Sequence, residues 1–190
     1  MNVVAASELG RAFGQTLAEV RDLLQAQNVR FALIGGIAVG LRAEPRATKD
    51  VDLVISVDAS RAPDVLADLE GHGFTTVRHG LPGPGAVVRL HRVGPDGVRA
   101  WVDLLFEGTD LERSLLDRAT TELLFGGVAL PVATTEDLIL LKLLAHRPQD
   151  LLDVRNLISF HLGTLDLTYL RSHARDWEIE AELEQFLAAQ

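Results

Sequence analysis

The sequence predicts an α/β (α+β) protein in which a mixed β-sheet is flanked by helices and followed by a helical C-terminal extension. Two patterns predict this fold class. Short runs of apolar residues fall between residues 31 and 106, whereas the last third of the chain repeats apolar residues at helical spacing. We therefore expect a core domain over residues 1–132 and a helical C-terminal subdomain over residues 133–190.

Composition narrows the class of protein. The chain has 190 residues, 47% of them hydrophobic, and 27 acidic against 18 basic side chains give a net charge of −9. This balance argues against a protein that coats nucleic acid through its overall charge. Cysteine is absent, which excludes disulfides, thiolate metal sites and cysteine nucleophiles. We find no apolar run long enough for a membrane span and no signal-peptide pattern, so we expect a cytoplasmic protein with no membrane partner.

The N-terminal quarter predicts a helix, a strand and a second, short helix. Apolar side chains at helical spacing over residues 7–28, with Ser7 as the N-cap, predict an amphipathic helix. The run RFALIGG (30–36) predicts a buried strand that ends in two glycines. The segment IAVGLR (37–42) predicts a brief helix, because Pro45 prevents its continuation.

The middle of the chain is predicted to be mainly β. DVDLVISV (50–57) is expected to form a second strand, and Pro63 in the first turn supports a helix over residues 60–71. AVVRLHRV (86–93) and VRAWVDLLFE (98–107) are separated by GPDG, a turn signal. These two runs therefore predict an antiparallel hairpin.

The rest of the chain is predicted to be helical apart from an extended piece at residues 127–132. Thr134 and Thr135 precede two acids, a pattern typical of a helix start. The expected helices cover residues 111–119, 134–146, 150–161 and 166–188.

Three aspartates are candidates for a metal site. Asp50 and Asp52 stand two residues apart in a predicted strand, so their carboxylates face the same side, about 7 Å apart at the backbone. They repel each other unless a cation intervenes or one is protonated. Asp103 lies in the apolar run AWVDLLF, where a carboxylate needs a metal, another cation or the exposed end of the strand. A pair of Mg²⁺ ions, as used for in-line phosphoryl displacement, would satisfy all three; a solvated strand face or a salt bridge is the alternative.

A glycine pair and two basic residues surround these aspartates. Gly35 and Gly36 fall where a strand is expected to turn into a helix, and backbone N–H groups at such a turn can hold phosphates. Tight turns also use glycine for steric reasons alone. Arg46 and Lys49 supply positive charge where a triphosphate would lie, or they pair with neighbouring acids.

The ordered set of motifs resembles the polymerase-β-like nucleotidyltransferase superfamily. IGGIAVGLR, PRATKDVDLVI and WVDLLF match its hG[GS], DhD and third-acid motifs. With TTEDLILLKLLAHRPQDLLDV, the chain more closely resembles the AbiEii-type nucleotidyltransferases, toxins of bacterial toxin–antitoxin systems that include the MenT toxins of mycobacteria. One departure is that Gly36 and Ile37 stand where the superfamily commonly has serine, so a hydroxyl contact to phosphate is missing.

The resemblance implies a set of site residues. Asp50, Asp52 and Asp103 would be catalytic and hold two Mg²⁺ ions, or Mn²⁺ in their place. Lys142, in the helix DLILLKLLAHR, would reach the phosphates of the NTP; a lysine that extends to the surface is the alternative. The expected nucleotide-binding residues are Gly35, Gly36, Arg46, Thr48, Lys49 and Asp150. Asp150 follows Pro148, so an N-cap role is equally compatible with its position.

The function implied is transfer of NMP from an NTP to an acceptor hydroxyl, by a toxin that acts on tRNA or other RNA and has a cognate antitoxin protein as partner. Four arginines give residues 78–99 a net charge of +3, which favours a polyanionic acceptor, although strand alternation does not place all four on one face. An antibiotic nucleotidyltransferase with an aminoglycoside-like acceptor and an inactive nucleotide- or protein-binding module are the alternatives. The six histidines show no zinc-binding spacing.

Overall fold

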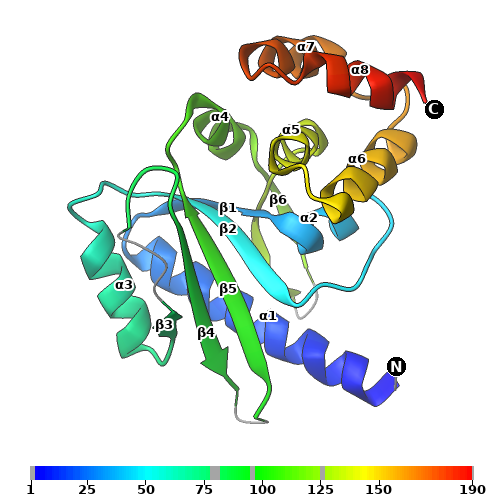
Figure 1. Ribbon diagram of the computed structural model, residues 1–190. Coiled ribbons are helices and arrows are strands. Elements are labelled where there is room, and N and C mark those ends of the chain that lie inside the picture. Colours follow the sequence, from blue (N-terminus) through cyan, green and yellow to red (C-terminus); the bar gives the residue numbers. More distant parts are fainter. Residues whose placement is uncertain (1–2, 78–81, 95–96, 125–126, 190) are drawn as a thin grey trace.

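A computed structural model describes residues 3–77, 82–94, 97–124 and 127–189, with side chains from residue 14 onward. Helices and strands are interspersed along the first two thirds of the chain, and helices alone follow (Figure 1). The helices are α1 (Val3–Ala26), α2 (Gly35–Arg42), α3 (Ala62–Gly71), α4 (Asp110–Arg118), α5 (Thr135–Ala145), α6 (Pro148–Phe160), α7 (Leu167–Asp176) and α8 (Glu180–Ala188). The strands are β1 (Arg30–Ile34), β2 (Asp50–Ser56), β3 (Thr75–Val77), β4 (Val87–Val93), β5 (Arg99–Phe106), β6 (Thr120–Leu123) and β7 (Ala129–Val132).

The strands form one seven-stranded mixed sheet in the order β3-β4-β5-β2-β1-β7-β6. β2 lies at its centre, antiparallel to β1 and parallel to β5. β4 and β5 form the antiparallel hairpin that the GPDG turn predicts. This order brings the start of β2, the end of β1 and the middle of β5 together, although they are far apart in the sequence.

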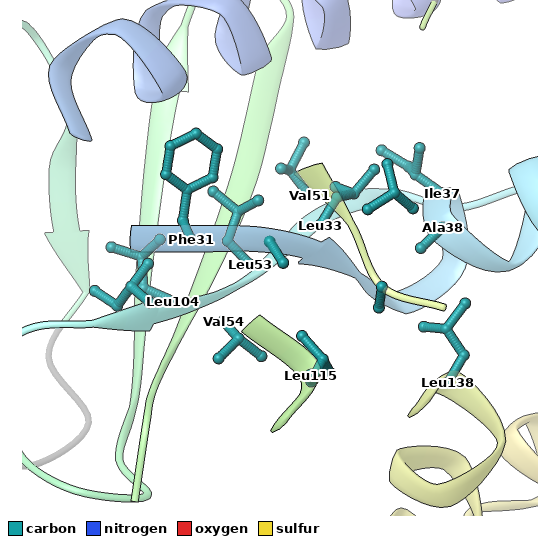
Figure 2. Close-up of a cluster of buried hydrophobic side chains, with 14 of the residues drawn as sticks. Phe31, Leu33, Ile37, Ala38, Val51, Leu53, Val54, Leu104, Leu115 and Leu138 are labelled. Atoms are coloured by element: carbon teal, nitrogen blue, oxygen red, sulfur yellow. The ribbon is translucent and has the colours of Figure 1, made fainter. Parts of the chain in front are cut away.

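Apolar side chains cover the two faces of the sheet differently. Phe31 and Leu53 point to the face that carries α1 and α3, whereas Val54 points to the opposite face, where Leu115 of α4 covers it (Figure 2). Alternation along β2 therefore places Asp50 and Asp52 on the same face as Val54, beyond the part that α4 covers.

The C-terminal helices pack on this second face. α5 contacts α2, and α6 and α7 pack against α5. Buried apolar residues of these helices, among them Leu138, Val154 and Leu170, belong to one hydrophobic core with the strands. The last strand ends at Val132, at the boundary that the sequence predicts, but the division into two domains stays a prediction.

The structure corrects several expected boundaries. The first strand ends at Ile34, and both glycines that follow belong to α2. The short strands β3 and β6, at the two edges of the sheet, are not predicted, because three and four residues carry too little alternation to be recognised. The helix expected over 166–188 is two helices, since Glu178 adopts a left-handed backbone with φ of 59°.

Within the described ranges, every helix is too short or too polar to cross a membrane.

Candidate active site

The three predicted aspartates lie side by side on two parallel strands. Asp50 and Asp52 occupy alternate, partly exposed positions of β2 on either side of the buried Val51, as the sequence predicts. Asp52 pairs in register with Asp103 of β5, so these two side chains leave the same face of the sheet one strand spacing apart. Parallel pairing between segments some fifty residues apart is what brings the third acid to the first two.

Arg89 neutralises two of these acids. It is the register partner of Asp103 across the β4–β5 hairpin, and its Nε and Nη2 donate to the two oxygens of that carboxylate over 2.7 and 2.5 Å. Its Nη2 also donates to Asp50 over 3.4 Å. The sequence leaves a metal, another cation or an exposed strand end open for Asp103, and the structure shows a cation, the guanidinium of Arg89. Arg89 was expected only as part of a basic stretch. A symmetric count outward from GPDG pairs it with Val102, one residue short of its observed partner Asp103, so the sequence alone does not give this contact.

The pKa of Asp52 reflects its burial and the charges around it. Burial and the neighbouring charges of Asp103 and Asp50 raise its pKa from 3.8 to about 6. The positive charge of Lys142 and a hydrogen bond from the backbone N–H of Gly36 oppose this rise. An excess of negative charge thus remains around Asp52, which favours binding of a further cation.

The glycine pair makes room for this aspartate. Gly35 begins α2 with φ of +68°, and a Cβ on it would lie 1.9 Å from the Asp52 carboxylate. A Cβ on Gly36 would lie 2.8 Å from the Thr48 hydroxyl and 3.1 Å from an Arg46 guanidinium nitrogen. Both positions therefore require glycine because side chains of the following segment approach the backbone closely.

A second charged cluster faces Asp52 from the C-terminal helices. Lys142 of α5 is buried, which contradicts a surface position, and its Nζ lies 2.7 Å from Asp150 and 2.9 Å from Asp153 of α6. Arg46 makes a bidentate contact with Asp153 at 2.7 and 2.8 Å. Arg147 contacts Asp150 at 2.6 Å. Three cations against two carboxylates leave this cluster with a net positive charge.

The two acidic members of the cluster are fixed by α6. Asp150 and Asp153 are 1% and 2% exposed, and hydrogen bonds to neighbouring cations hold the pKa of each below its usual range despite burial. Asp150 is not an N-cap; it is the third residue of α6 and accepts from the backbone N–H of Arg147, which is the N-cap. It supports Lys142 in this structure, and a contact of Asp150 with nucleotide stays a prediction.

The other predicted residues lie in the segment between α2 and β2. The Thr48 hydroxyl donates to the backbone carbonyl of Asp50 over 3.4 Å, which links it to the start of β2. Lys49 is exposed and forms no ion pair within the described ranges, so its proposed pairing with a neighbouring acid is not seen. Their roles toward nucleotide stay predictions.

The aspartates offer the hard oxygen donors that Mg²⁺ prefers. Across the part of the chain that the structure describes, however, no group of three acidic or histidine side chains is arranged to hold a metal ion. Asp50 and Asp103 both accept hydrogen bonds from Arg89, which is consistent with this finding. The carboxylate oxygens of the three aspartates are thus suitable ligands for magnesium. In this structure the guanidinium of Arg89 contacts two of the three carboxylates.

Two solved structures have a fold similar to that of this chain. A nucleotidyltransferase-like antigenic protein from Paracoccidioides brasiliensis is 20% identical with a TM-score of 0.56, over 93% of this chain and 92% of that one. ANT(2″)-Ia in complex with adenylyl-2″-tobramycin is 15% identical with a TM-score of 0.56, over 86% of this chain and 97% of that one. No curated protein sequence matches significantly.

The family model described as nucleotidyl transferase AbiEii toxin, type IV toxin–antitoxin system, matches residues 20–188. This match spans the sheet, the aspartates and the C-terminal helices. It confirms the resemblance to the AbiEii-type nucleotidyltransferases that the sequence motifs indicate. The chain therefore belongs to the AbiEii nucleotidyltransferase toxin family.

Proposed function

We propose that this protein transfers NMP from an NTP to a hydroxyl group of an RNA acceptor, and that it acts in the cytoplasm as the toxin of a toxin–antitoxin pair. The observation that carries the proposal is the register of Asp52 with Asp103 beside the Gly35 turn. Family membership supports the nucleotidyl transfer and the toxin role.

In the proposed reaction, the acceptor oxygen attacks the α-phosphorus of the NTP, the bond to the β-phosphate oxygen breaks, and pyrophosphate leaves. Asp50, Asp52 and Asp103 would hold two Mg²⁺ ions, or Mn²⁺, which supply charge stabilisation for phosphoryl transfer when bound. Asp103 would accept the proton of the attacking hydroxyl, because it lies on the strand farther from the glycine turn.

The triphosphate would lie between the start of α2 and the cluster on α5 and α6. The net positive charge of Lys142, Arg46 and Arg147 with their two aspartates would attract it. Gly35 and Gly36 leave the backbone of the turn uncovered by side chains. In this arrangement Lys142 is preorganised, because two carboxylates fix its ammonium before the nucleotide arrives.

The chemical test incubates the purified protein and Mg²⁺ with each of the four α-labelled NTPs and total RNA, and measures label in RNA. We expect transfer by the wild type, loss of about 10²–10³-fold or more in Asp52→Asn, and normal transfer by Asp64→Asn, an exposed residue on α3. Absence of transfer with every NTP, or equal transfer by Asp52→Asn, contradicts the proposed reaction.

The biological test expresses the protein in bacteria with and without the product of the adjacent gene. Growth arrest that Asp52→Asn abolishes and the neighbouring protein relieves supports the toxin role. Resistance to an aminoglycoside-type antibiotic supports instead an antibiotic acceptor, as named for ANT(2″)-Ia. Metal-dependent NTP binding without turnover supports an inactive binding module.

A further inference from the structure

A tryptophan lies on the same sheet face as the aspartates. Trp101 of β5 is the register partner of Asp50, one strand spacing or about 4.8 Å away. It is partly exposed, whereas its neighbours Ala100 and Val102 are buried on the opposite face. A large aromatic ring next to a catalytic centre, outside the hydrophobic core, is not explained by packing.

Basic side chains surround this ring. The guanidinium carbons of Arg89 and Arg99 lie 5.5 and 5.6 Å from the centroid of Trp101. His91 contacts the ring edge-on at a centroid distance of 5.1 Å. Arg99 is exposed and contacts no carboxylate within the described ranges. The four residues Arg89, His91, Arg99 and Trp101, here called the tryptophan platform, thus combine an aromatic ring with positive charge.

The described arginines of the basic stretch (residues 78–99) lie on two different faces of the sheet. Arg92 alternates to the other face of β4, where it pairs with Glu19 of α1 and lies over Phe74. Arg78 lies outside the described residues. Of the basic stretch, Arg89 and Arg99 therefore lie on the face of the aspartates, on either side of Trp101.

The position of the platform relative to the aspartates indicates which substrate it meets. In the proposed reaction, the pyrophosphate leaves toward the glycine turn at the end of β1, on one side of β2. Trp101 and its neighbours lie on β5 and β4, on the other side of β2. In-line displacement brings the attacking hydroxyl from the side opposite the leaving group. The platform consequently lies on the side from which the acceptor approaches.

We propose that the tryptophan platform binds the single-stranded end of an RNA acceptor, with an unpaired base stacked on Trp101 and the backbone phosphates near Arg99. Unpaired bases stack on aromatic rings, and arginines beside such rings contact phosphates. Arg99, which contacts no carboxylate within the described ranges, would repel a cationic antibiotic acceptor at this place. This inference rests on the proposed function for the direction of approach, and it specifies the acceptor as a single-stranded polyanion.

The chain offers a direct reporter because it has two tryptophans, Trp101 and Trp177. Trp177 follows α7 and packs against the hydrophobic core. In Trp177→Phe, fluorescence reports Trp101 alone, and in Trp101→Phe it reports Trp177 alone. Both are titrated with a single-stranded oligoribonucleotide of about 8 nucleotides, with its blunt duplex, with Mg²⁺–NTP and with an aminoglycoside.

We expect the single strand to quench the tryptophan fluorescence of Trp177→Phe saturably and to leave the fluorescence of Trp101→Phe unchanged. Trp101→Ala should weaken binding of the labelled single strand by about 5- to 150-fold in Kd, the range for loss of one stacked base, with Mg²⁺–NTP affinity unchanged. Trp101→Phe, which keeps a ring, should retain more affinity than Trp101→Ala. Arg99→Ala should weaken binding and reduce its dependence on salt. Unfolding midpoints of each variant establish that it is folded.

Three results overturn the inference: no quenching of Trp101 by the single strand, quenching by Mg²⁺–NTP with a loss of NTP affinity in Trp101→Ala, or quenching by the aminoglycoside alone. The binding assay needs no turnover, so it separates the two proposals. Single-strand binding at Trp101 without label transfer contradicts the proposed reaction and supports the platform. Label transfer to RNA with an unchanged RNA KM in Trp101→Ala contradicts the platform and supports the reaction.

Discussion

Asp52 destabilises the metal-free protein, and its replacement by asparagine should therefore be stabilising. Burial and the charges of Asp103 and Asp50 raise the pKa of Asp52 from 3.8 to about 6. A rise of about 2 pKa units corresponds to about 3 kcal/mol of unfavourable free energy when the group is ionised. Asparagine has nearly the same shape and can accept the hydrogen bond from Gly36, but it carries no charge.

The pH dependence follows from the sign of the shift. Between pH 4 and 6 the native state binds more protons at Asp52 than the unfolded state does, so this residue lowers stability as the pH rises. The difference in unfolding free energy between Asp52→Asn and wild type should be near zero below about pH 4. It should grow through pH 6 and level off near 3 kcal/mol as an upper value above about pH 7.

The measurement is urea unfolding of both proteins in EDTA at several pH values, with Asp64→Asn as a control on an exposed aspartate of α3. Groups distant from Asp52 contribute equally to wild type and variant, so they cancel in the difference, whereas Asp50 and Asp103 lose the repulsion of Asp52 in the variant. A variant that is no more stable than wild type at pH 7.5, or a difference that does not grow with pH, refutes the reasoning. Addition of Mg²⁺ should stabilise the wild type more than the variant, because the ion neutralises the repulsion that asparagine has already removed.

Three further substitutions, two of them with a matched control variant, test other parts of the site and the residues that support it. Gly35→Ala should abolish transfer and destabilise the fold, because its Cβ would displace the aspartate carboxylate at 1.9 Å. Gly73→Ala, also at positive φ but with open space around the Cβ, should lose only the 1–2 kcal/mol or so of left-handed strain in urea unfolding. Lys142→Met should lower the unfolding free energy by about 3–5 kcal/mol, since it leaves two buried carboxylates with one cation fewer. Arg147→Ala, whose side chain is 73% exposed, should cost less than about 1 kcal/mol in the same assay. Tyr169→Phe should lose about 1–3 kcal/mol in thermal unfolding, because its hydroxyl donates to a fully buried carboxylate of α5 over 2.6 Å; unchanged melting would contradict this.

Local patterns determined most of the fold and the identity of the acids. The glycine pair, the alternation of Asp50 and Asp52 and the GPDG turn each act over a few residues, where steric and hydrogen-bonding preferences are strong. They predict the strand–turn–helix, the shared face of the two aspartates and the β4–β5 hairpin, all of which the structure has. The apolar neighbours of Asp103 also limit its carboxylate to a metal, another cation or the exposed end of the strand.

The tertiary structure decided which charged groups meet. Arg89 joins Asp103 and Asp50 because β5 pairs with β4 on one side and with β2 on the other. Lys142 has buried partners because α6 packs on α5, and Arg46 reaches Asp153 across 107 residues. Such contacts depend on strand order and helix packing, which are fixed by burial of apolar surface over the whole chain. The sequence by itself therefore determined the acids and the few ways in which their charge can be accommodated, and only the packed sheet and helices decided that arginines and a lysine lie beside them.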